Sequence, residues 1–137
     1  MVEARRGVRV IKEFSHEMIE ALLDALPVDI TFVDEEDRVR YFNKEGKRIF
    51  ARSRKIIGIK VQKCHPQKSI HVVNTILEDF RNNKRDSANF WIDLKGRKIY
   101  IRYFAVRHKE GKYLGCLEVT QDITEIQKIT GEKRLLD

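Results

Sequence analysis

The pattern of apolar and polar residues predicts a helix near the N-terminus. Ser15 is a good N-cap residue, and Phe14 and Ile19 have the spacing of a hydrophobic staple. Apolar residues then recur at helical period as far as Leu26, and Pro27 ends the helix. Residues 1–13 alternate apolar and basic side chains without a turn signal, so we expect a basic tail there.

Short alternating segments predict a sheet of five strands. The first two form a hairpin around an acidic turn at residues 35–37. Two further turns contain Gly96 and Gly111, where a positive φ is expected. The strands are predicted over residues 29–34, 38–42, 88–94, 98–108 and 113–121.

Helical patterns fill the remaining chain. Asn43 can cap a short helix over residues 44–51, and Pro66 suits the start of a longer helix that Asn82 ends. Residues 122–125 should end the last strand and open an exit helix or linker over 127–137, and Gly131 weakens this helix. The longer helix carries one apolar stripe, made of Ile70, Val73, Ile76, Leu77 and Phe80.

Length and composition restrict the class of protein. A chain of 137 residues suits one α+β domain, and 42% hydrophobic residues with one Trp, four Tyr and seven Phe exclude a disordered chain. No apolar run is long enough to span a membrane, and no signal peptide is visible. Cys64 and Cys116 give no disulfide framework, so we expect a cytoplasmic protein.

The charges are segregated along the chain. Residues 13–37 hold nine acids and no Lys or Arg, whereas residues 38–68 hold eleven bases and one acid, within a net charge of +7. The basic block could attract anions, including nucleic acid. It offers few aromatic side chains for stacking bases, so nucleic acid is the less favoured partner. The alternative is that the acidic and basic blocks face each other, within one chain or across a dimer.

Three motifs resemble those of the PAS domain family. They are LPVDITFVDEEDRVRYFN with its asparagine at Asn43, the turn Ile57-Gly58-Ile59-Lys60, and YLGCLEVTQDITE with its D-I-T-E exit. The resemblance covers residues 22–129. It implies a five-stranded antiparallel sheet with short helices over one face, and a single PAS domain over residues 14–126 between an N-terminal capping helix and a C-terminal exit helix.

A closer resemblance involves CHPQKSIHVVNTILEDF and NFWI. These segments are similar to the PAS segment at the C-terminal end of certain bacterial and archaeal proteins. Those proteins also carry a hemerythrin-like domain and a domain of unknown function.

PAS domains are sensors, so the resemblance implies a pocket between sheet and helices. A haem is one candidate cofactor, with His65 as its ligand because His71 lies on the far side of the helical stripe. A flavin is unlikely, because the sequence around Cys64 departs from the light-sensing motif. Cys64 is also a redox candidate, since a helix start and nearby positive charge lower a thiol pKa. No spacing of Cys and His supports a metal site.

Function is therefore predicted as sensing and signalling without enzyme activity, since catalytic motifs are absent from the sequence. A small, mostly apolar ligand would bind in the pocket, and a homodimer would form through the N-terminal helix and the outer sheet face. The alternative is a PAS module that only dimerises. The expected pocket residues are Ile30, Phe32, Val39, Tyr41, Ile49, His65, Ile70, Val73, Phe90, Ile101, Tyr103, Leu117 and Val119.

Overall fold

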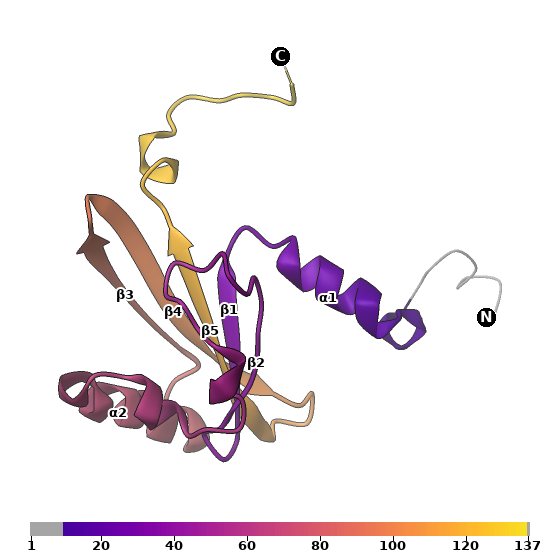
Figure 1. Ribbon diagram of the computed structural model, residues 1–137, viewed down its shortest axis with the longest axis vertical. Coiled ribbons are helices and arrows are strands. Elements are labelled where there is room, and N and C mark those ends of the chain that lie inside the picture. Colours follow the sequence, from indigo (N-terminus) through magenta and orange to yellow (C-terminus); the bar gives the residue numbers. More distant parts are fainter. Residues whose placement is uncertain (1–9, 137) are drawn as a thin grey trace.

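A five-stranded antiparallel sheet forms the centre of the computed structural model, which describes residues 10–136 (Figure 1). Its spatial order is β2-β1-β5-β4-β3, so the first and last strands of the chain lie together in the middle. The strands are β1 (Asp29–Asp34), β2 (Val39–Phe42), β3 (Ser87–Leu94), β4 (Arg97–Arg107) and β5 (Tyr113–Asp122). The predicted sheet is confirmed.

Two α-helices, with different surroundings, accompany the sheet. α2 (Ile70–Arg81) lies across one face, where it buries Val73, Ile76, Leu77 and Phe80. α1 (His16–Asp24) projects away from the sheet (Figure 1) and buries none of its residues. The first helix starts as its sequence indicates, because Ser15 Oγ accepts a hydrogen bond from the Met18 N–H at 3.1 Å.

Local sequence also explains the tightest turn. Lys95 and Gly96 join β3 to β4 with φ values of 51° and 80°, which is the pattern of a type I′ hairpin. Gly115 in β5 is required for a steric reason, because a Cβ at this position would lie 2.1 Å from the Val33 carbonyl oxygen. A side chain at that position would separate β5 from β1.

Two predicted helices are wrong. Residues 44–51 form turns and bends, in which Lys44 and Gly46 take positive φ values that an α-helix does not allow. The exit helix is reduced to one 3-10 turn, Ile126–Lys128. Residues 129–136 are irregular and exposed. A short helix is stable only when its apolar side packs against the rest of the protein, and no described residue packs against this segment.

Helix α2 also starts later than expected. Pro66 precedes a 3-10 turn at Gln67–Ser69, and the α-helix begins at Ile70. Its predicted end is confirmed, since Asn82 is the C-cap. Of the tail expected over residues 1–13, residues 1–9 lie outside the described part, and Ile11–Glu13 form a 3-10 turn. No helix in residues 10–136 has the length and apolar character required to cross a membrane.

The strand registers decide which side chains share a face. Thr31 pairs with Glu118, and Glu118 pairs with Tyr103, so these three lie on the inner face toward α2. Phe32 pairs with both Tyr41 and Leu117 on the opposite, outer face. The inner face therefore includes polar residues, and much of the outer face is apolar.

Candidate functional site

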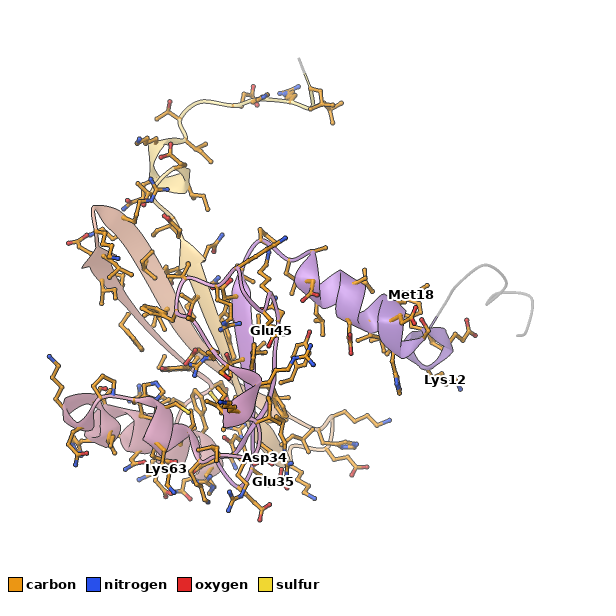
Figure 2. The ribbon with its side chains drawn as sticks, in the orientation of Figure 1. Lys12, Met18, Asp34, Glu35, Glu45 and Lys63 are labelled. Carbon is orange, nitrogen blue, oxygen red and sulfur yellow. The ribbon has the colours of Figure 1, made fainter. Side chains whose placement is uncertain are left out.

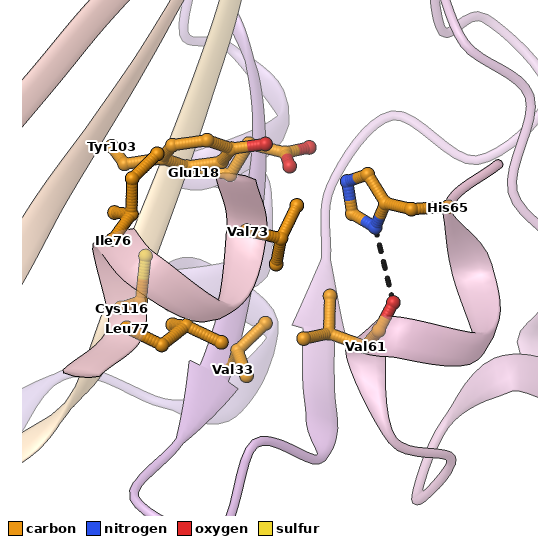
Figure 3. A pocket seen from close by; sticks show the side chains of 9 residues that line it. All are labelled: Val33, Val61, His65, Val73, Ile76, Leu77, Tyr103, Cys116 and Glu118. Atoms are coloured by element: carbon orange, nitrogen blue, oxygen red, sulfur yellow. Dashed lines mark hydrogen bonds between the residues drawn. The ribbon is translucent and has the colours of Figure 1, made fainter. Parts of the chain in front are cut away.

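A small cavity remains where α2 packs against the inner face of the sheet (Figure 3). Its volume is about 20 Å³, enough for one water molecule. Pockets that bind drug-sized ligands measure about 300–1,000 Å³, so neither a haem nor a flavin fits this space. The lining residues are Val33, Val61, His65, Val73, Ile76, Leu77, Tyr103, Cys116 and Glu118.

A buried ion pair adjoins the cavity. Arg52 Nη2 lies 3.0 Å from Glu118 Oε1, and the two side chains are only 11% and 10% exposed. The Nε of Arg52 is buried without a hydrogen-bond partner among the described residues. Removing one member would leave the other charge buried and unpaired, so each depends on the other.

Tyr103 lies next to this ion pair, with its hydroxyl beside the Glu118 carboxylate (Figure 3). Burial, and after it the negative charge of Glu118, raises the pKa of Tyr103 far above its ordinary value. The tyrosine therefore stays protonated at physiological pH. A neutral hydroxyl beside a carboxylate gives the apolar cavity one polar wall.

His65 forms the opposite wall of the cavity (Figure 3). Its Nδ1 lies 3.1 Å from the carbonyl oxygen of Val61. Since a carbonyl oxygen only accepts, Nδ1 is the donor in this hydrogen bond. This hydrogen bond fixes the ring orientation on the loop before α2.

The two cysteines have different surroundings. Cys64 ends the 3-10 turn Val61–Cys64, and five residues separate it from the start of α2. The helix start that was expected to activate it is therefore not adjacent. Cys116 is buried, and burial raises the pKa of its thiol. Within residues 10–136, no cluster of His, Cys, Asp and Glu is suited to hold a metal ion.

Asn43 is the centre of a second buried polar group. Its side-chain oxygen accepts from the Ile30 N–H at 2.7 Å, and its amide donates to the carbonyls of Leu23 and Val28. Arg48 donates to the Ile30 carbonyl and to Thr31 Oγ1. Burial lowers the pKa of Arg48. These bonds fasten the end of α1 and the irregular segment 44–51 to β1.

The predicted pocket residues divide between the two faces. His65, Val73 and Tyr103 line the cavity. Val39 and Ile101 belong to the same core, and Ile49 and Phe90 pack against it. Ile70 is half-buried at the start of α2.

The prediction that all the strand residues share one face is wrong for five of them. Successive residues of a strand point to opposite faces of the sheet, and Thr31, Glu118 and Thr120 point inward. The residues next to these in β1 and β5, and the residue of β2 that pairs with one of them, therefore point outward. The five residues are Ile30, Phe32, Tyr41, Leu117 and Val119.

Several lining residues were not predicted. Ile76 and Leu77 belong to the apolar stripe of α2, so the helical periodicity alone could have added them. Glu118 gave no such signal, because a glutamate in a strand is usually exposed. Only the approach of Arg52 explains its burial.

The basic block is partly neutralised by the fold. Arg40 contacts Asp34 at 2.5 Å and Arg54 contacts Glu45 at 2.9 Å. Arg38 donates to the Gly58 carbonyl oxygen. Together with the half-buried Arg48 and Arg52, these contacts remove part of the positive charge of the block, and its lysines form no ion pair among the described residues.

Comparisons with known proteins agree with this architecture. A family model described as PAS domain matches residues 19–124. No curated protein matches the sequence.

Several solved structures are similar to this chain. A C-terminal domain from Streptococcus mutans is 34% identical, with a TM-score of 0.78, and the match covers 85% of this chain and 91% of that one. The PAS domain of BvgS from Bordetella pertussis is 19% identical, with a TM-score of 0.59 and coverage of 82% and 88%. A sensory box sensor histidine kinase from Vibrio cholerae is 14% identical, with a TM-score of 0.56 and coverage of 79% and 90%.

Proposed function

Because this chain belongs to the PAS domain family, whose members include sensory modules of histidine kinases, we propose that it is a signalling module that acts as a homodimer. The observation that carries the proposal is the uncovered apolar stripe of α1. Met18 and Leu22 of α1 are 42% and 52% exposed, and Leu26, two residues after the helix, continues the stripe at 36%. Burying such a stripe in an interface is favourable by the hydrophobic effect.

Helix α1 is held by the rest of the chain at one end. Asp24 accepts from the Lys44 N–H, and the Leu23 carbonyl accepts from Asn43. Elsewhere the helix makes no extensive contact with any described helix or strand, and the side chain of Met18 projects into open space (Figure 2). A second copy can therefore reach the stripe without displacing the core.

The outer sheet face offers a complementary surface. The guanidinium of Arg102 lies over the rings of Tyr100 and Phe104, at 4.9 and 5.7 Å from their centres, and Trp91 is 63% exposed. Trp, Tyr and Arg are the residues that most often dominate binding energy at interfaces.

Light scattering of the purified protein tests the dimer. We expect a dimer for the unaltered chain and a monomer for Leu22→Asp. The matched control is Leu135→Asp, which adds the same charge at an exposed leucine of the C-terminal segment and should leave the dimer intact. A monomer at every concentration tested, or a dimer that survives Leu22→Asp, would refute the proposal.

A second proposal is that the domain senses a small ligand in the cavity. It is supported by the three polar side chains of His65, Tyr103 and Glu118 around an otherwise apolar space. A ligand larger than water must enlarge this space, which would move β5 and the segment that follows it. A ligand changes such an equilibrium only by its differential affinity for the two states.

Native mass spectrometry of the purified protein tests ligand binding. The expected result is a bound small molecule that is absent from Val73→Leu, in which one additional methylene occupies the cavity. A mass that equals the bare polypeptide, with no heat stabilisation by any member of a small-molecule panel, would argue for a module that only dimerises.

A further inference from the structure

The two edges of the sheet are treated differently by the fold. At the β2 edge, the Val39 N–H donates to Ile59, and the Val39 carbonyl accepts from Gly58. The segment before α2 therefore covers that edge. At the β3 edge, β4 is the partner on one side, and no described residue pairs with β3 on the other (Figure 1).

The register identifies which backbone groups of β3 are free. The Ala105 N–H donates to the Asp86 carbonyl, so these two residues form a hydrogen-bonded pair. Such pairs occur at every second position of an antiparallel ladder. The next hydrogen-bonded pairs with β4 are therefore Ala88–Tyr103 and Phe90–Ile101. The N–H and C=O groups of Asn89 and Trp91 consequently point away from the sheet. Natural edges are usually protected by Lys, Pro or a bulge, and residues 88–92 contain none of these.

A groove runs beside this edge, between β3 and α2. It encloses about 390 Å³. Its apolar lining includes Val72, Ile76, Ala88 and Phe90, of which Val72 is 53% exposed. A strand added to β3 would place alternate side chains in this groove and the others beside Trp91.

The charges around the groove favour an acidic occupant. The acids near it are already paired with bases: Asp79 with Arg85, Asp86 with Arg107, and Asp93 with Lys98. On the outer side of β3, beside Trp91, Arg102 is the strand partner of Asn89 and forms no ion pair with a carboxylate among the described residues. Lys84, next to the lining residue Arg85, forms none either. The remaining local charge is positive, so it attracts negative partners.

We propose that the β3 edge and its groove bind an extended, acidic segment of a partner protein by strand addition. Backbone hydrogen bonds to Asn89 and Trp91 supply affinity, and apolar side chains of the partner fill the groove. The groove and the cavity beneath α2 share Ile76 in their linings. Because Trp91 also belongs to the outer face proposed for the dimer, the test below is made with Leu22→Asp as well as with the unaltered chain, so that the two proposals can fail separately.

A labelled peptide provides the test. The probe is a blocked, fluorescein-labelled peptide of eight residues in which valine and glutamate alternate, and its binding is followed by fluorescence polarisation. The only tryptophan of the chain, Trp91, gives a second signal at the site itself. We expect saturable binding with a change in Trp91 emission. The same peptide with lysine in place of glutamate should bind at least about tenfold more weakly.

Two changes isolate the backbone contribution. Asn89→Pro removes one free N–H without touching the bonds to β4, whereas Asn89→Ala keeps it. We expect about tenfold weaker binding for the proline variant and no change for the alanine variant, with equal thermal midpoints. A peptide that is N-methylated at alternate residues should not bind.

Three results would overturn the proposal. They are absence of saturable binding, binding that Asn89→Pro and N-methylation leave unchanged, and protection of the Asn89 and Trp91 amides from hydrogen exchange that increases with protein concentration. The last result would mean that a second copy of this chain occupies the edge.

Discussion

The inner and outer faces of the sheet both combine apolar and polar side chains, so they differ less than the two faces of a sheet with one face in water usually do. The inner face contains Thr31, Glu118 and Thr120, all buried, whereas the outer face presents Phe32, Tyr100 and Trp91. Burial inside is made possible by arginines from distant segments that pair with the polar groups. Polarity alone therefore does not identify the core of this domain.

The largest predicted difference in stability is between a substitution in α2 and one in α1. Phe80 of α2 is fully buried, and Leu22 of α1 is 52% exposed. Phe80→Ala should lower the free energy of unfolding by about 4 kcal/mol, because it leaves a cavity in the core. Leu22→Ala should change the stability of the monomer by less than about 0.5 kcal/mol. Urea denaturation of both variants at low protein concentration measures the difference.

The next largest predicted loss of folding stability comes from breaking the buried ion pair. Arg52→Met should cost about 3 kcal/mol, because Glu118 then remains charged and buried without a partner. The double variant Arg52→Met with Glu118→Leu should recover most of that loss. If the single and double variants were equally unstable, the ion pair would not be the cause.

Asn43 tests whether the irregular segment depends on its hydrogen bonds. Asn43→Ala should cost about 2 kcal/mol, since buried backbone groups of Ile30 and Leu23 lose their partner. Asn89→Ala on the exposed edge is the matched control, with no expected loss. An equal effect of the two substitutions in chemical denaturation would contradict a special role for Asn43.

The smallest predicted effect is the pH-dependent stability that Asp34 contributes to the hairpin between β1 and β2. Burial acts to raise the pKa of Asp34, but the Arg38 backbone N–H and the Arg40 side chain together lower it below 3.8. A lowered pKa stabilises the fold above the unfolded value, and this contribution is lost as the pH falls through the folded pKa. Asp34→Asn should therefore cost about 1 kcal/mol at pH 7.

The same difference should shrink as the pH falls below 3.8. Denaturation midpoints of both proteins across the acid range measure it. A difference that stays constant with pH would show that Asp34 acts through hydrogen-bond geometry alone.

Much of the fold follows from local patterns in the sequence. The strand 29–34 and the cap at Ser15 were predicted as they occur, because alternation and capping depend on neighbouring residues. The helix predicted over 44–51 failed because Asn43 and Arg48 bind β1 and hold that segment in turns. The exit helix failed because nothing in the described chain packs against it.

Less of the candidate site could be predicted from the sequence. His65, Val73 and Tyr103 were found through the helical stripe and the family motifs, and they do line the cavity. Ile30 and Val119 were assigned to the wrong face, because a strand that is apolar on both sides gives no local sign of its inner side.

The sequence by itself determined the order of the five strands and of the two α-helices, because propensity, capping and turn chemistry act within a few residues. The tertiary structure alone decided which face is buried, how small the cavity is and which edge remains open. Those properties depend on contacts between residues far apart in the chain, such as Arg52 with Glu118, and their energies arise only after the chain has folded.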